Sequence, residues 1–452
     1  MSDFNTISNN DFMIEKIKER PINRKKLIRR TVTTVTMALI FGLVACFTIL
    51  FLEPIISDYL YPEEEPEPIT FVEDEEEMKP EDMLEEKEIE KETIIQIIQQ
   101  EPANPQLDQE QVEEILEAVT FDKTHYIQLH EVMSEYVAEL DQYMVTVTGV
   151  EEDQDWLANS YENTSNTYGV IVKKNNKDIF ILTDYSTLKK ADKIQVTFKN
   201  GKQNDAVLMG KHTEMDIAIV AVSKEEYGTE EDIELLPEAP LISSYSLLKE
   251  GDPIVAMGSP MGVMDSVGYG IITAKKEETG MVDYNYNVIM TDIYGSMYAR
   301  GILFNMEGEI VGVIAPTRTG TDMRNMVMAY GISDLKLMIT ALSSGKQVPY
   351  LGIKGTSVAK NATYINANNQ EEKIPDGAYV TDVIMNSPAM LEGVQKGDII
   401  TGLGNFTVRN YSDFASAMYK FESGQVVKIT LMRLSQGIYK EMSMNVVLSG
   451  AE

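Results

Sequence analysis

The 452-residue sequence has one cysteine, three histidines and few basic residues for its length. Cys46 stands alone, which excludes an intramolecular disulfide and a cysteine-rich metal site. His125, His130 and His212 leave little material for a zinc centre or for proton transfer near neutral pH. We therefore expect no metal and no cofactor. The 72 Asp and Glu outnumber the 39 Lys and Arg, and the net charge of −33 argues against nucleic acid as a partner, because phosphate binding needs a basic face.

Charge is also absent from residues 31–52, a run long enough to span a bilayer as one helix. Basic residues cluster within residues 15–30, directly before this run, whereas acidic residues follow it. The positive-inside rule places a basic tail, residues 1–30, in the cytoplasm and the later domains outside the cell membrane, so we expect a single-pass protein. The alternative is a cleaved signal peptide, which normally has a shorter apolar run. Cys46 lies in the run, either as a packing residue or as a palmitoylation site.

Residues 53–120 read as an acidic stalk with helical segments. Within it, residues 63–92 hold 16 Asp and Glu against three Lys. Such a block repels itself and cannot bury a core, so it predicts a solvated, extended tether. Isoleucines and leucines at helical spacing follow in residues 83–100, before Pro102 ends the pattern. A short coiled coil that oligomerises the stalk is one interpretation of that segment, but the pattern spans too few heptads to require it.

A folded body is predicted from residue 121 onward. Residues 124–141 have a helical period, with Ile127, Met133, Val137 and Leu140 on one face. Short strand-like segments then recur with turns between them, as in an all-β barrel or sandwich. These segments are 143–150, 167–174, 178–185, 193–200, 204–211, 216–222, 251–260, 268–277, 285–293, 300–305 and 309–316, before a strand and a closing helix in 328–342. Two barrels of about six strands each fit this count.

The order of several sequence blocks resembles the HtrA/DegP family of serine proteases. The blocks are TYGVIV, ILTDYSTL, TEMDIAIVAV, GDPIVAMGSPMG, GYGIITA, TDIYGSMYARGILFNMEGEIVGV and MAYGIS. The resemblance implies a mostly β protein, with a chymotrypsin-like double β-barrel in residues 121–345 and a PDZ domain in residues 346–452. It also implies a homotrimer or another homo-oligomer, with which a stalk coiled coil would agree.

The family's catalytic positions are only partly retained in this sequence. The family's His follows a block like ILTN, and the matching block ILTDYSTL holds Ser186 at that position. The family's Asp is kept as Asp216, at the start of DIAIVAV. The family's Ser lies in GNSGGPL, and the matching loop GSMYARG holds Ala299 there, followed by Arg300. Serine attack needs a base near neutrality and a hydroxyl nucleophile, so these replacements predict a pseudoprotease rather than an enzyme.

A displaced catalytic site is the alternative interpretation of the same loop. Ser296 could act as nucleophile with His212 and Asp216, provided that His212 swings into the cleft. Otherwise Ser296 is a turn residue, His212 a solvated loop residue, and Asp216 holds a loop by hydrogen bonds.

The C-terminal blocks resemble a PDZ domain of the HtrA type, above all SPAMLEGVQKGDII at residues 387–400. The resemblance implies that the loop Tyr350, Leu351, Gly352 and Ile353 presents backbone N–H groups to the terminal carboxylate of a peptide, beside a free strand edge. Phe414 and Met418, one helical turn apart, either line the side-chain pocket or pack in the core.

Three functions follow from these readings. The first is an HtrA-like pseudoprotease on the outer face of the cell membrane, which binds C-terminal or unfolded peptides as scaffold, holdase or regulator. The second is an active serine endopeptidase with an unorthodox site. The third is a structural or assembly protein that takes no ligand. Peptide binding separates the first from the third, and peptide-bond cleavage separates the second from both.

Overall fold

The computed structural model describes residues 36–37, 69, 71, 123–154, 160–278, 281–314, 325–366 and 368–450. The chain divides between residues 65 and 66, and almost everything described belongs to the second part. The predicted membrane span at 31–52, except for residues 36–37, and most of the stalk at 53–120 therefore lie outside the described residues. Among the described residues, no helix combines the length and the apolar character needed to cross a bilayer.

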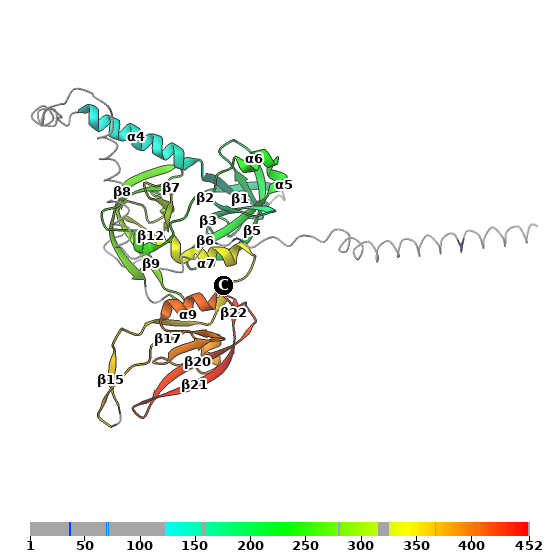
Figure 1. Cartoon of the computed structure of the whole chain (residues 1–452). Coiled ribbons are helices and arrows are strands. Elements are labelled where there is room, and N and C mark those ends of the chain that lie inside the picture. Colours follow the sequence, from blue (N-terminus) through cyan, green and yellow to red (C-terminus); the bar gives the residue numbers. More distant parts are fainter. Residues whose placement is uncertain are drawn as a thin grey trace, which may run out of the picture. The chain divides into compact units, whose positions relative to one another are not determined.

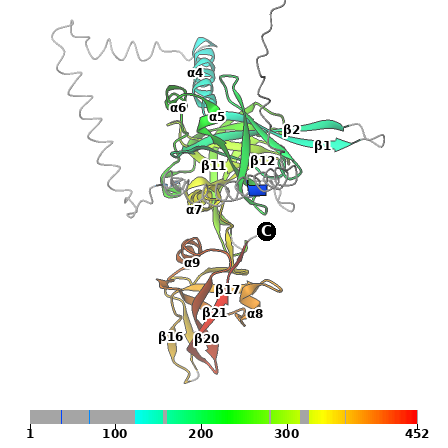
Figure 2. The same cartoon turned by 90° about the vertical axis from the view of Figure 1, so that its right-hand side faces the viewer.

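A helix and a closed six-stranded barrel begin the folded body (Figure 1). Helix α4 (Lys123–Asp141) precedes the barrel, whose antiparallel strands neighbour one another in the order β1-β2-β3-β6-β5-β4. The strands are β1 (Met144–Gln154), β2 (Ser160–Lys174), β3 (Asp178–Asp184), β4 (Lys193–Thr197), β5 (Gln203–His212) and β6 (Ile217–Ser223). Figure 2 shows the paired β1 and β2 extending beyond the barrel. Buried branched residues such as Val147, Ile181 and Val220 fill the interior.

A second closed barrel follows after three short helices, α5 (Lys224–Tyr227), α6 (Glu230–Glu234) and η1 (Tyr245–Leu247). Its strand order is β10-β11-β12-β9-β8-β7. The strands are β7 (Pro253–Ser259), β8 (Ser266–Glu278), β9 (Tyr286–Tyr294), β10 (Arg300–Phe304), β11 (Ile310–Ile314) and β12 (Met326–Gly331). The prediction of two barrels with about six strands each is confirmed.

Helix α7 (Ile332–Ser343) leaves the second barrel and contacts both barrels. It packs on β5 and β6 of the first barrel and on β9, β11 and β12 of the second. Its buried apolar face includes Leu335, Met338, Ile339 and Leu342, which makes the helix part of the common core.

The C-terminal domain is built on one main antiparallel sheet with two short helices. Its main sheet has the order β14-β17-β18-β20-β21, and helix α9 contacts β14, β17 and β18 (Figure 1). The elements are β13 (Pro349–Tyr350), β14 (Ile353–Ser357), β15 (Thr363–Ile365), β16 (Glu371–Lys373), β17 (Ala378–Val383), α8 (Pro388–Leu391), β18 (Ile399–Leu403), β19 (Phe406–Thr407), α9 (Tyr411–Met418), β20 (Val426–Ser435), β21 (Ile438–Val447) and β22 (Ser449–Gly450). Strand β14 lies at one end of the main sheet, so one of its edges is unused by the sheet.

Two features of the region before the barrels differ from expectation. The predicted solvated tether at 63–92 contains Ile69, which is only 3% exposed and belongs to the main hydrophobic core, against which Phe71 also packs. Burial of these apolar side chains is favourable, and it holds this point of the acidic segment against the folded body. The expected apolar face of α4 is also only partly used, because Leu140 is buried whereas Ile127 is exposed.

Candidate functional site

Ser186 and Asp216 lie in direct contact beside the first barrel. Strand β3 ends at Asp184 and places Ser186 two residues later, while Asp216 stands just before β6 with a positive φ of 59°. The Ser186 backbone N–H donates to Asp216 Oδ1 at 2.6 Å, and its hydroxyl lies 2.9 Å from Asp216 Oδ2. The structure thus brings together the positions that resemble the family's His and Asp. A hydroxyl cannot take a proton near neutral pH as imidazole does.

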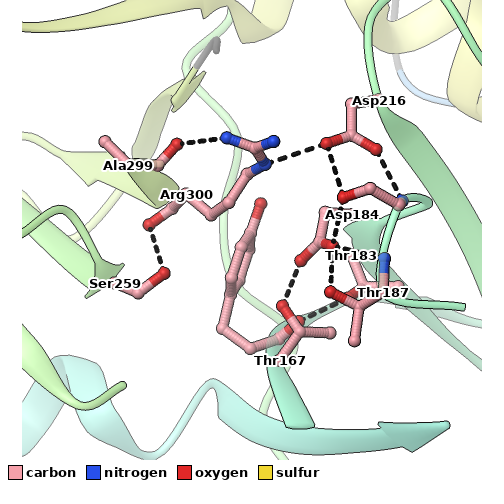
Figure 3. Close-up of polar contacts among 10 residues, drawn as sticks. Thr167, Thr183, Asp184, Thr187, Asp216, Ser259, Ala299 and Arg300 are labelled. Atoms are coloured by element: carbon pink, nitrogen blue, oxygen red, sulfur yellow. Dashed lines mark hydrogen bonds and ion pairs between the residues drawn. The ribbon is translucent and has the colours of Figure 1, made fainter. Parts of the chain in front are cut away.

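A second carboxylate, Asp184, stabilises the turn that holds Ser186 by accepting hydrogen bonds from it. Its side chain is buried and accepts hydrogen bonds from the hydroxyls of Thr167 and Thr187 and from the Thr187 N–H (Figure 3). The Ser186 hydroxyl also lies 3.3 Å from Asp184 Oδ2. Because both carboxylate oxygens of Asp184 accept hydrogen bonds, the residue serves to hold the turn after β3.

Ala299 is buried directly before strand β10, and its backbone amide is already hydrogen-bonded. The Ala299 N–H donates to the Ser296 carbonyl at 2.9 Å. In acyl transfer, an amide at this place must point at the developing oxyanion of the substrate. The Ala299 amide instead closes a turn within the loop, so this conformation has neither a nucleophile nor a free oxyanion donor at residue 299.

Arg300 opens strand β10 of the second barrel and reaches Asp216 beside the first barrel, a contact that the sequence did not predict. Its Nε donates to Asp216 Oδ2 at 2.8 Å, and its Nη1 donates to the Ala299 carbonyl at 2.9 Å (Figure 3). The ion pair is largely shielded, with side-chain exposures of 20% for Arg300 and 11% for Asp216. The guanidinium therefore takes the acceptor that a histidine would need, and it compensates the carboxylate charge. The available sequence signal was a charged side chain in the loop GSMYARG, where the family motif GNSGGPL has glycine.

The displaced triad is not assembled in the structure. His212 ends strand β5, is 8% exposed rather than solvated, and accepts the Met215 N–H at Nδ1. Burial lowers the pKa of His212 to about 4, which makes it a weak base at neutral pH. The Ser296 hydroxyl accepts the Tyr298 N–H at 3.1 Å within its own turn. Each of the two side chains is thus engaged locally.

A polar cavity of about 440 Å³ opens beside Ser186. Its lining belongs to the first barrel and includes Gly149, Glu151, Asn166, Thr187 and Lys190. Ala299 and Arg300 do not line it. The cavity therefore does not reach residue 299, where the scissile bond of a substrate would have to lie.

The predicted carboxylate loop of the C-terminal domain meets a carboxylate of the second barrel. Asp283 lies between β8 and β9 and is completely buried. The Leu351 N–H donates to its Oδ2 at 2.8 Å, the Gly352 N–H lies 2.9 Å from both oxygens, and the Ile353 N–H donates to Oδ1 at 2.9 Å. Tyr350, the fourth predicted loop residue, is half-buried in strand β13. Sequence reasoning missed Asp283, because nothing links it to a loop almost seventy residues later.

Phe414 and Met418 lie on helix α9 and are fully buried. Both belong to the core that also contains Leu351 and Ile353. Their positions are compatible with a pocket floor and with plain core packing, so the assignment to a peptide pocket stays a prediction.

The titration of Asp283 makes a testable contribution to stability. Burial raises its pKa from 3.8 to about 6, Glu214 adds to this, and the backbone N–H groups oppose it. Burial also raises the pKa values of the facing Tyr284, Tyr411 and Tyr419, which stay neutral. Since the folded pKa exceeds the unfolded one, the stabilisation is complete below about 3.8 and is lost as the pH rises through about 6.

Lowering the pH from about 7.5 to about 5 is therefore expected to raise the free energy of unfolding of the natural chain, relative to an Asp283→Asn variant, by about 1–1.5 kcal/mol. Urea unfolding of both proteins at the two pH values measures this difference. A difference that grows as the pH rises would instead mean that the three N–H groups depress the pKa of Asp283.

Comparisons with known proteins match the two halves of the folded body separately. The family described as "Trypsin-like peptidase domain" matches residues 167–313, and the family described as "PDZ domain" matches residues 349–446. The serine protease Do-like HtrA of Lactococcus lactis subsp. cremoris (strain MG1363) is 26% identical over 284 residues, which cover 59% of this chain and 67% of that protein. The probable periplasmic serine endoprotease DegP-like of Buchnera aphidicola subsp. Baizongia pistaciae is 29% identical over 272 residues, which cover 59% of this chain and 55% of that protein.

Among solved structures, the HtrA-type protease AlgW with decapeptide has a TM-score of 0.49 and 18% identity, and the match covers 70% of this chain and 98% of that chain. The chain matches between about half and two thirds of the length of the two curated relatives. It carries a trypsin-like peptidase domain followed by a PDZ domain, and the curated relatives that it matches are HtrA-type serine proteases at modest identity.

Proposed function

We propose that this protein is an HtrA-like pseudoprotease that binds C-terminal or unfolded polypeptides through its PDZ groove, as scaffold, holdase or regulator. The observation that carries the proposal is the chemistry of two positions. Ser186 stands where the family has its base, and Ala299 stands where the family has its nucleophile. Neither side chain can perform the proton transfer or the attack that peptide hydrolysis requires.

The environment of these positions supports the proposal. The Arg300 guanidinium is paired with Asp216, and the Ala299 amide is bonded to the Ser296 carbonyl. A productive site would need that carboxylate to orient a base and that amide to face an oxyanion. Both groups serve the packing of the loop instead, which suits a domain kept for binding and assembly.

Location and partners follow from the sequence and belong to the same proposal. The uncharged run at 31–52 anchors the chain in the cell membrane, with the basic tail 1–30 in the cytoplasm and the folded domains outside. The strongly acidic composition argues against a nucleic-acid partner. The family resemblance favours a homotrimer or another homo-oligomer, and we assign no metal or cofactor to the protein.

An active serine endopeptidase is the second candidate, because the curated relatives are described as serine proteases. In this chain Ser296 is the hydroxyl available in the loop for that role. It would require the turn around Ser296 to open, because the hydroxyl now accepts the Tyr298 N–H.

A cleavage assay separates the two candidates. The purified full-length chain is incubated with unfolded casein beside a Ser296→Ala variant, and fragments are followed on a gel. We expect no cleavage above buffer by either protein, because loss of triad members removes a factor of roughly 10⁶ in turnover. A Ser186→His, Ala299→Ser variant reports whether restoring two positions suffices. Cleavage by the natural chain that disappears in Ser296→Ala would establish the endopeptidase instead.

A further inference from the structure

The Asp283 carboxylate takes the place in the loop that the terminal carboxylate of a bound peptide would take. Two oxygens of one carboxylate receive the N–H groups of three successive residues, Leu351, Gly352 and Ile353. Gly352 has a φ of 88°, and this left-handed conformation turns neighbouring N–H groups toward a common point. A loop of this shape binds one carboxylate, so an external peptide end and Asp283 cannot occupy it together.

The backbone contacts of the same segment continue along the free edge of strand β14. The Asp283 N–H donates to the Ile353 carbonyl at 2.7 Å, and the Asn285 side-chain amide donates to the Gly355 carbonyl at 3.1 Å. Carbonyls two residues apart in a strand face the same side. These two carbonyls lie on the side away from β17, where an added peptide strand would bond.

Aromatic packing holds this segment in place. Tyr284 is buried, its hydroxyl donates to the Pro349 carbonyl at 2.9 Å, and its ring lies 4.8 Å from that of Tyr419. The Tyr286 hydroxyl is also 3.4 Å from the Tyr419 hydroxyl. Tyr419 directly follows helix α9, which forms the other wall of the predicted groove. The contact therefore reaches both sides of the peptide site.

We propose that Asp283, Tyr284 and Asn285 form a built-in ligand of the PDZ domain, which closes its carboxylate loop and strand edge to external peptides until the segment withdraws. The inference rests on the proposed peptide-binding function and names its regulation. Because the segment belongs to the same chain, it competes at a high effective concentration. The apparent affinity for a peptide is then reduced by the fraction of molecules in which the groove is open.

The partner that displaces the segment is a polypeptide with a free α-carboxylate. The buried side chains around the loop, Leu351, Phe414 and Met418, are apolar and favour an apolar last residue. Binding of such an end releases the β8–β9 connection of the second barrel from the PDZ domain. The device thus couples occupancy of the groove to the freedom of a barrel loop.

The experiment measures peptide affinity and amide exchange in the full-length chain. The probe is a fluorescein-labelled decapeptide pool with a fixed C-terminal valine, used as free acid and as C-terminal amide. We expect Asp283→Ala, and the milder Asp283→Asn, to raise the affinity for the free-acid pool at least tenfold and to leave that for the amidated pool unchanged. The exchange of the Leu351, Gly352 and Ile353 amides is expected to accelerate in both variants.

Asp265→Ala is the matched control. Asp265 is exposed on the same barrel and has a φ of 58°, close to the 64° of Asp283, so the control carries the same backbone strain without the contact. Equal free-acid affinity of natural chain and Asp283 variants would overturn the built-in ligand while leaving peptide binding intact. Unchanged exchange of the three amides would overturn it as well. No binding by any of the proteins would overturn the proposed function and this inference together.

Discussion

Replacing Gly301 by alanine is expected to destabilise the second barrel by roughly 3–5 kcal/mol, from steric overlap and backbone strain combined. Gly301 faces Gly258 across the β7–β10 ladder, and its φ is 142°. A Cβ at residue 301 would overlap the Met257 carbonyl oxygen, a backbone atom that cannot rotate away. Urea unfolding, with amide exchange of β7 as a local reporter, measures the loss.

Gly251→Ala is the control for this prediction. Gly251 has a φ of 95°, and no atom lies within 4 Å of the place that a Cβ would take there, so alanine adds conformational strain alone. We expect about 1–2 kcal/mol for that variant. Equal losses of unfolding free energy in the Gly251 and Gly301 variants would mean that β7 and β10 can move apart to accept a Cβ at residue 301. The result bears on function, because it assigns a glycine of the GSMYARG loop to packing.

Replacing Arg433 by methionine is expected to destabilise the PDZ domain by roughly 3–5 kcal/mol, because it leaves a buried charge uncompensated. Asp398 is 1% exposed and receives the Arg433 guanidinium through Nε and Nη2, both at 2.7 Å. The same guanidinium donates to the Gly393 carbonyl at 2.8 Å. Hydrogen bonding to Asp398 raises the pKa of Arg433, so the arginine stays charged. Methionine retains the apolar stem and removes only the charge and its donors.

A second substitution isolates the charge. Adding Asp398→Asn to the Arg433→Met chain removes the unpaired carboxylate, and we expect the double variant to recover at least half of the lost stability. Glu422→Ala is the surface control, since its pair with Lys346 is more than half exposed on both sides, and it is expected to leave the melting temperature unchanged. Amide exchange of strand β18 reports on the domain. A double variant as unstable as the single one would assign the loss to packing.

Regular elements of the fold were predictable because their signals are local. Alternating and branched segments such as GILFN and EIVGV form β10 and β11 at nearly the expected residues. Closure of each barrel follows from the number of short antiparallel strands and their turns. The short helices α5 and α6 were missed, since four or five residues carry too little periodicity to be recognised. The burial of Ile69 was missed because the acidic composition around it dominated the interpretation.

The candidate site likewise has features that short sequence blocks reveal and features that only the structure reveals. The substitutions Ser186 and Ala299 could be found by aligning short blocks, and the sequence itself shows what chemistry they lack. The Arg300 pair with Asp216 needed the structure, because the two residues come from different barrels. The Asp283 contact with Gly352 likewise depends on how one barrel loop meets a separate domain. Such long-range pairings leave no periodic trace in the chain.

The late position of helix α7 in the sequence leaves the first barrel incomplete during synthesis of the chain. Strands β5 and β6 are complete at Ser223, yet part of their outer surface is covered by a helix that ends only at Ser343. Leu342 packs directly against Gly210 of β5. At typical synthesis rates the ribosome needs on the order of ten seconds to make the intervening chain. During that interval the first barrel presents an uncovered apolar surface, so a nascent chain that stalls between the barrels is exposed to aggregation and proteolysis.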